Sequence, residues 1–249
     1  MHPNLTNEPD RANEFIESAI EKGFSEICFT DHMPLSIDNA GDRIKKGNIN
    51  QYCEAIQEKA KEYEGVIKIK TGIEIDYHPD FINEIETVLE QGTFDYIIGA
   101  SHLHIPGFDI KMATMTPDEF AKMSFENSLL AIKSGYFDTI AHLDLQRWVY
   151  TLPKRFKMLK GEYDIKNHIS IIKEIMKELE KNKVKLEINT IAILHKVSDE
   201  GAYPCHEIMN ISYDYNIDYV FGSDAHSYDR VGEGYDKLKE SKEYGRALK

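Results

Sequence analysis

The stretch that decides the fold runs from Val220 to His226 and reads Val-Phe-Gly-Ser-Asp-Ala-His. The apolar residues from Tyr219 to Phe221 predict a buried strand, which ends at Gly222 and is followed by a carboxylate and an imidazole two residues apart. Side chains in extended backbone alternate between two faces, so we expect Asp224 and His226 to project to the same side of the chain. An oxygen ligand and a nitrogen ligand at the end of a strand suit a divalent metal. On this pair alone an alternative remains open, in which Asp224 caps the next helix and His226 lies on the surface.

Similar junctions recur along the chain. Strand-like and helix-like patterns alternate six times, which is typical of a parallel sheet. The strands are predicted at 27–29, 66–75, 96–102, 139–142, 184–188 and 219–221, and the helices at 12–22, 51–63, 81–91, 117–134, 165–180, 204–215 and 233–249.

Five of the six predicted strands end in a potential metal ligand. These residues are Asp31 with His32, Glu74, His102, His142, and Asp224 with His226, while the sixth strand ends in Asn189. Sites in parallel α/β proteins lie at the carboxyl ends of the strands, and only a closed ring brings every strand end to one centre. The sequence therefore predicts an α/β barrel with a metal site. A single histidine beside an apolar run is usually a hydrogen-bonded core residue, whereas Glu74 on a buried strand is costly unless it is paired or bound to a cation.

Length, charge and cysteine content limit the number of domains, the partners and the cellular location that we expect for the chain. The 249 residues show no linker or break in composition, so we expect one domain over 1–249. The 43 acidic and 30 basic residues give a net charge of -13, which argues against a nucleic-acid partner. Three cysteines without close spacing indicate neither a disulfide framework nor a thiolate metal site. No apolar run approaches the roughly 20 residues that span a bilayer, so we expect no membrane partner and a cytoplasmic location, and the oligomeric state stays open.

The junctions, in their order along the chain, resemble those of the PHP superfamily of polymerase and histidinol-phosphatase domains. The fragments that carry the resemblance are Thr30-Asp31-His32, Gly72-Ile73-Glu74-Ile75-Asp76-Tyr77, Gly99-Ala100-Ser101-His102, Ala141-His142-Leu143-Asp144-Leu145, Glu187-Ile188-Asn189-Thr190 and Gly222-Ser223-Asp224-Ala225-His226. Met33-Pro34-Leu35, Glu187-Ile188-Asn189-Thr190 and the chain length look most like the histidinol-phosphatase branch.

This resemblance implies a distorted, TIM-like barrel of seven βα units that holds two or three divalent ions of zinc, manganese or iron. The implied metal ligands are His32, Glu74, His102, His142, Asp224 and His226, with His2 as a further candidate. Glu74 would bridge two metals, Asp224 would bind one of them, and His102 with His142 the other. His32 and His226 would bind the remaining metal. Glu74, Asp224 and His226 are the implied catalytic residues.

The sequence departs from the family pattern at its start. The family's first strand carries a His-x-His pair, whereas this sequence begins at Met1-His2-Pro3, inside what resembles the loop after that strand. We expect either that the first strand precedes the sequence given or that two ligands and one strand are lost. The same departure accounts for six predicted strands in place of seven.

The expected reaction is hydrolysis of a small phosphorylated metabolite, in which hydroxide from a metal-activated water attacks phosphorus in line with the leaving alcohol. Arg147 and Lys196 are candidates for holding the phosphate, although a lone basic residue in a loop is more often a surface charge. Asn189 is a candidate for a substrate hydroxyl or amine, or else caps the following turn. Asp76 and His104 lie two residues beyond proposed ligands and either support them or face solvent.

We therefore predict a metal-dependent phosphomonoesterase that converts L-histidinol phosphate to L-histidinol and phosphate. Two alternatives stay open. One is a phosphoesterase of the same superfamily that acts on a phosphodiester or a nucleotide, and the other is a catalytically impaired metal-binding protein that lacks the His-x-His pair.

Overall fold

The computed structural model describes residues 1–5, 11–36, 43–103, 115–151, 162–195 and 201–248. The chain forms two compact units, and each unit is made of two separate stretches of the sequence. The first unit contains Met1–Ile98 and Ser223–Glu233, and the second contains Gly99–Gly222 and Gly234–Lys249. Among the described residues, no helix is both long enough and apolar enough to cross a membrane.

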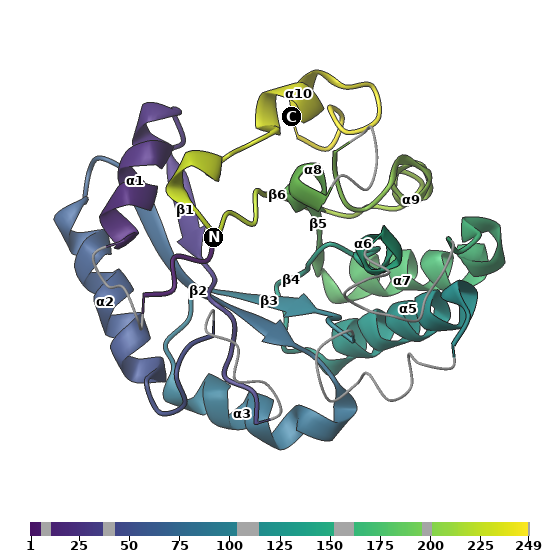
Figure 1. Cartoon of the computed structure of the whole chain (residues 1–249), viewed down its shortest axis with the longest axis horizontal. Helices are drawn as coiled ribbons and strands as arrows, with labels where there is room; N and C mark the ends of the chain where they lie inside the picture. Colours follow the sequence, from purple (N-terminus) through teal and green to yellow (C-terminus); the bar gives the residue numbers. More distant parts are fainter. Residues whose placement is uncertain (6–10, 37–42, 104–114, 152–161, 196–200, 249) are drawn as a thin grey trace. The chain divides into compact units, whose positions relative to one another are not determined.

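The first unit is built on parallel strands that are joined through helices. Strand β1 (Glu26–Phe29) pairs in parallel with β2 (Lys68–Asp76), with Glu26 opposite Lys68, and β3 (Tyr96–Ala100) follows β2 in the strand order. The helices of this unit are α1 (Arg11–Glu21), α2 (Ile49–Glu62), the 3-10 turn η1 (Pro79–Phe81), α3 (Ile82–Gln91) and the 3-10 turn η3 (Tyr228–Arg230). Figure 1 shows α1 and α2 beside β1 and β2. The sheet edge where these strands end carries Asp31, His32 and Glu74.

In the second unit the strand order runs from the end of β3 through β4 (Thr139–Ile140) and β5 (Lys185–Asn189) to β6 (Tyr219–Gly222), and the pairs β4–β5 and β5–β6 are parallel. Its helical elements are α5 (Pro117–Ser134), α6 (Gln146–Thr151), η2 (Ile165–His168), α7 (Ile169–Asn182), α8 (Ile191–His195), α9 (His206–Ser212) and α10 (Tyr235–Glu240). The β5–β6 register places Glu187 opposite Val220 and Asn189 opposite Gly222. The strand ends of this unit therefore carry His142, Asn189 and Gly222 at one edge.

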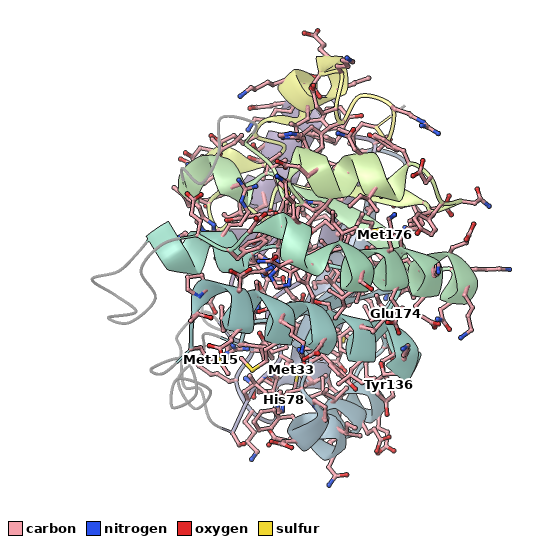
Figure 2. All side chains as sticks on the ribbon, turned by 90° about the vertical axis from the view of Figure 1, so that its right-hand side faces the viewer. Met33, His78, Met115, Tyr136, Glu174 and Met176 are labelled. Atoms are coloured by element: carbon pink, nitrogen blue, oxygen red, sulfur yellow. The ribbon has the colours of Figure 1, made fainter. Side chains whose placement is uncertain are left out.

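Helix α5 begins and ends where the sequence predicts, and the reason is its capping chemistry. The Thr116 hydroxyl accepts a hydrogen bond from the Glu119 amide at 3.3 Å, and the Glu119 carboxylate accepts one from the Thr116 amide at 2.7 Å. This reciprocal capping box satisfies two amides that the first helical turn leaves without partners. Pro117 occupies the first turn, and Gly135 ends the helix in the left-handed conformation at φ 79°. Helices α5 and α7 lie side by side in both views, and Glu174 of α7, labelled in Figure 2, pairs with Lys133 of α5 at 2.9 Å.

Apolar side chains on helices of both units are buried in the core. Phe15 and Ile16 of α1 are fully buried, as are Phe125 of α5 and Met176 of α7. Burying side chains of this size contributes about 1.5–3 kcal/mol each to folding. Phe120 of α5 is buried as well.

The structure corrects several predicted boundaries. The helix predicted over 233–249 is shorter, since α10 covers only Tyr235–Glu240 between Gly234 and Ser241, and residues 242–248 form turns. The helix predicted at 204–215 is shorter, since α9 covers only His206–Ser212. Helices α6 and α8 lie in segments where the sequence predicts loop. The expectation of one domain over 1–249 stays a prediction.

Candidate metal centre

Two buried side chains, His2 and Glu74, and the partly buried Asp224 converge at the strand ends of the first unit. The His2 Nε2 atom lies 3.0 Å from Asp224 Oδ1 and 3.3 Å from Glu74 Oε2. His2 and Glu74 are 4 % and 3 % exposed. One imidazole and two carboxylates thus offer ligand atoms that all lie within 4.8 Å of one another.

Backbone hydrogen bonds hold His2 in this place. Thr30, just after β1, donates its amide to the Met1 carbonyl at 2.8 Å, and the His2 amide donates to the Ala225 carbonyl at 2.9 Å. The first residues therefore lie between the end of β1 and the segment that follows β6. Asp31, which is 1 % exposed, secures the next turn. Its carboxylate accepts hydrogen bonds from the Asn4 and Leu5 amides, each at 3.1 Å. Burial raises the pKa of Asp31, and these two hydrogen bonds oppose that rise.

Two more imidazoles stack beside His2. Its ring lies 4.5 Å from the His32 ring and 4.6 Å from the His226 ring, measured between centroids, with interplanar angles of 14° and 24°. His32 reaches this position because the chain beyond β1 continues in a parallel bridge beside Glu74. The three histidines form a second group of ligand atoms within 4.8 Å of one another.

Asp224 and His226 are brought together in a way that the strand pattern alone does not predict. Asp224 has φ 49°, a left-handed conformation, so the backbone has left the strand. The His226 Nδ1 atom is 2.9 Å from the Asp224 carbonyl oxygen, which can only accept. Nδ1 is therefore the donor, and in the neutral ring Nε2 keeps its lone pair. The Asp224 side chain pairs with His2, so the alternative that it caps the next helix is not what the structure shows.

The electrostatics of the group follow from burial and pairing. Burial lowers the pKa of His2, but the hydrogen bonds to Asp224 and Glu74 outweigh this effect and raise the pKa to about 9. Burial raises the pKa of Asp224, yet the hydrogen bond and charge of His2 hold it well below its usual range. Desolvation and the charge of His2 lower the pKa of His226, although its side chain is 43 % exposed, as the surface alternative for this residue expects. The metal-free group thus holds a proton on His2, which a metal ion would replace on binding.

The described residues fit a divalent metal. Two ligands about 2.1 Å from a tetrahedral zinc ion lie about 3.4 Å apart, and the His2 pairs are close to that separation. The His2 Nδ1 atom is also buried without a hydrogen-bond partner among the described residues. Imidazole and carboxylate ligands suit zinc, manganese and iron.

In the second unit, His102 and His142 face each other. Their Nε2 atoms are 3.2 Å apart, a separation that also suits two ligands of one metal ion. His142 is 3 % exposed and has φ 23°, so it too stands where the backbone leaves its strand. Six of these seven proposed ligands are predicted at strand ends, and His2 is a further candidate from the family resemblance. The structure groups His2, His32, Glu74, Asp224 and His226 in the first unit and His102 with His142 in the second.

Asp76 supports the first group rather than facing solvent. Asp76 is 3 % exposed and pairs with Arg43, which is 7 % exposed. The Arg43 Nη1 atom also donates to the Met33 carbonyl at 3.0 Å, and the Ile44 amide donates to the His32 carbonyl at 2.9 Å. Sequence reasoning missed Arg43, and the signal that could have found it is a cation next to apolar Ile44 in a long polar loop.

The structure gives a different outcome for each candidate for substrate contact. The Arg147 Nη1 atom lies 3.6 Å from the carboxylate of buried Asp144, and its side chain is 26 % exposed. Asn189 Oδ1 accepts from the Ile191 amide at 2.9 Å, so this side chain caps the turn into α8, as one of its two predicted roles requires. Lys196 and His104 lie outside the described residues.

Comparisons with known proteins define the class. The family model for the PHP domain matches residues 4–191, and the chain belongs to this family. The probable histidinol-phosphatase of Deinococcus radiodurans is 30 % identical over 240 residues, which cover 93 % of this chain and 86 % of that protein. The histidinol-phosphatase of Bacillus subtilis is 28 % identical over 251 residues, which cover 93 % of this chain and 92 % of that protein.

Solved structures agree on the fold. The crystal structure of histidinol phosphate phosphatase from Lactococcus lactis, complexed with zinc, L-histidinol and phosphate, matches with a TM-score of 0.72 at 19 % identity. The match covers 92 % of this chain and 86 % of that chain. A putative histidinol phosphatase from Listeria monocytogenes matches with a TM-score of 0.70 at 18 % identity, over 95 % of this chain and 97 % of that chain. The predicted α/β fold of PHP type and the predicted histidinol-phosphatase branch are confirmed.

Proposed function

We propose that this protein is a metal-dependent phosphomonoesterase that hydrolyses L-histidinol phosphate to L-histidinol and phosphate. The observation that carries the proposal is the buried group of His2, Glu74 and Asp224 with the stacked rings of His32 and His226. Relatives named histidinol-phosphatase that align over nearly the whole chain support the choice of substrate.

The proposed metal complement is two or three divalent ions of zinc, manganese or iron. His32, Glu74, Asp224 and His226, with His2, are the proposed ligands of the first unit, and His102 and His142 those of the second. Bound ions of this type supply Lewis acidity and a water acidic enough to attack phosphorus near neutral pH. Glu74 and Asp224 both face the His2 imidazole. Burial raises the pKa of Asp224, but the hydrogen bond and charge of His2 hold it well below its usual range.

The chain's own residues would orient the substrate. Arg147 is positioned by Asp144 and has enough exposure to hold outer phosphate oxygens, for which a guanidinium is well suited. Lys196 and Asn189 are the further proposed contacts, to phosphate and to a substrate hydroxyl or amine. The acidic balance supports a small metabolite as the partner rather than a nucleic acid, and a cytoplasmic location remains a prediction from composition.

A panel of substrates tests this proposal. The metal-loaded protein is assayed for phosphate release from L-histidinol phosphate, other phosphomonoesters, a phosphodiester and an oligonucleotide. We expect kcat/KM to be highest for L-histidinol phosphate. Preference for the diester or the oligonucleotide would move the protein to another phosphoesterase class, and metal binding without release from any substrate would identify an impaired metal-binding protein.

A comparison of variants separates the site from the fold. Asp224→Asn keeps the size of the side chain but loses the carboxylate that faces His2, so we expect a loss of activity of at least 100-fold, as for other groups that act on the reacting centre. Lys122→Gln, which alters an exposed pair with Glu126 on α5, is the control and should leave activity unchanged. Full activity in Asp224→Asn with unchanged metal content would refute the proposed site.

A further inference from the structure

We infer that Glu187 is a positioning residue, whose carboxylate sets the backbone of His142 and the side chain of Asn189 and so orients two proposed site residues. This inference rests on the proposed function for its meaning, although its geometry is independent of any substrate. Glu187 lies on β5 and is 6 % exposed. A buried carboxylate in the middle of a short strand is costly and needs compensating hydrogen bonds.

The first contact is to the backbone of His142. The His142 amide donates to Glu187 Oε2 at 3.0 Å. Strand β4 ends at Ile140, and the Ala141 amide still donates to the Gly99 carbonyl at 2.9 Å. The amide of the next residue, His142, therefore donates to the Glu187 side chain and not to a strand carbonyl. His142 is also the residue at which φ becomes 23°. A carboxylate oxygen at this point satisfies the buried amide and fixes the direction in which the imidazole leaves the backbone.

The second contact is to Asn189, two residues along the same strand. Its Nδ2 atom donates to the same oxygen, Glu187 Oε2, at 2.9 Å. The opposite end of the Asn189 amide accepts from Ile191, so the side chain is held at both ends. One carboxylate oxygen, Glu187 Oε2, therefore accepts hydrogen bonds both from His142 in the loop after β4 and from Asn189 at the end of β5.

The third contact explains a glycine. Gly222 pairs with Asn189 at the end of β6, and a Cβ added to Gly222 would lie 2.0 Å from Glu187 Oε1. Real Cβ atoms do not approach a carboxylate oxygen so closely, so any larger residue at position 222 would displace the Glu187 carboxylate from its place. Gly222 is also the first residue of the Gly222-Ser223-Asp224-Ala225-His226 motif, which contains two of the proposed metal ligands.

The pattern of contacts predicts which feature of Glu187 matters. Both hydrogen bonds end on one oxygen, so a glutamine can place its amide oxygen there and keep them. An aspartate keeps the charge but is one methylene shorter and withdraws its oxygen from both donors. If Glu187 acts by position, glutamine will substitute for it and aspartate will not.

The experiment measures zinc binding to chelator-treated protein by calorimetry, for the wild type and for Glu187→Gln and Glu187→Asp. We expect Glu187→Asp to weaken the affinity of the site that contains His142 by about 10–100-fold, the usual effect of losing a group that orients a metal ligand. We expect Glu187→Gln to stay within about threefold of the wild type. Equal binding by all three proteins, or a glutamine variant as weak as the aspartate variant, would overturn the inference.

A second readout separates positioning from general support of the fold. The amide signal of His142 in nitrogen-15 spectra reports its hydrogen bond directly, and we expect it to shift in Glu187→Asp and to stay in place in Glu187→Gln. If Glu187→Asp fails to fold, the His142 signal of Gly222→Ala replaces it, because the added Cβ displaces the same carboxylate; an unchanged signal there would refute the inference. These measurements need no substrate, so the absence of phosphatase activity in the wild type would refute the proposed function alone.

Discussion

The buried pair of Arg43 and Asp76 is a sharp test of how the first unit holds its proposed ligands. The variant Arg43→Met keeps the length and apolar stem of the side chain but removes the guanidinium. Asp76 is 3 % exposed, so its carboxylate would remain in the interior without this partner. The Met33 carbonyl, which accepts from Arg43 at 3.0 Å, would lose the same donor.

The expected cost follows from the burial of both groups. Breaking a buried ion pair by removing one partner costs about 3–5 kcal/mol, because the remaining buried charge loses its oppositely charged neighbour. For a chain of this length such a loss lowers Tm by roughly 6–20 °C. An exposed pair is worth far less, with a median of about 0–1 kcal/mol. Lys133 and Glu174, which are 41 % and 53 % exposed at the side chain, form such a pair at 2.9 Å.

The assay is urea unfolding of the wild type, Arg43→Met, Lys133→Met and the double variant Arg43→Met with Asp76→Asn. We expect a large loss of unfolding free energy only in Arg43→Met. The double variant should recover part of this loss, because the side chain at position 76 is then neutral. In Lys133→Met the free energy of unfolding should change by less than about 1 kcal/mol. A change below about 1 kcal/mol in Arg43→Met would refute the reasoning that this pair is a buried support of the site.

Three further predictions concern packing, capping and protonation. Phe15→Ala should lower the free energy of unfolding by about 3–5 kcal/mol in a denaturant titration, because the ring is fully buried on α1; a loss below about 1 kcal/mol would contradict its place in the core. Thr116→Ala should cost about 1 kcal/mol by the same method, whereas Thr116→Ser keeps the capping oxygen and serves as the control; equal losses would argue against the cap. The pKa of His2 is raised to about 9, so its pairing stabilises the metal-free protein fully below about pH 6.5 and is lost as the pH rises through about 9. We expect Tm of the metal-free wild type to fall over that range and the fall to be smaller in His2→Gln, and an identical pH profile for both proteins would contradict this assignment.

Much of the fold is predictable from local signals. The capping box at Thr116 and the glycine at the end of α5 act within one helix, so they are visible in the sequence. The short helix α6 is not visible in this way, because the turn that precedes it is held by the contact of buried Asp144 with the Cys205 amide at 3.0 Å, far along the chain. Local propensity cannot report a contact of this kind.

In the candidate site too, some features follow from local sequence and others depend on contacts between distant segments. Most of the proposed ligand residues were predictable because each lies at or just beyond the end of an apolar run, and sites in parallel α/β proteins lie at the carboxyl ends of strands, whereas His2 was a candidate only through the family resemblance. The roles of Arg43 and Glu187 were not, since each depends on a partner in another segment: Asp76 for the former and the His142 amide for the latter. The left-handed backbone at Asp224 was also hidden, because this conformation is uncommon for residues other than glycine and the sequence pattern here is that of a strand.

The most direct measurement follows phosphate release from L-histidinol phosphate while the metal content of the protein is varied. The protein is freed of metal with a chelator, assayed, and then titrated with zinc, manganese or iron(II), with bound metal quantified at each step. A metal-dependent hydrolase predicts no release from the metal-free protein and a rate that rises with bound metal up to two or three ions per chain. Release at the full rate without bound metal, or no release at any metal content, would contradict the proposed function.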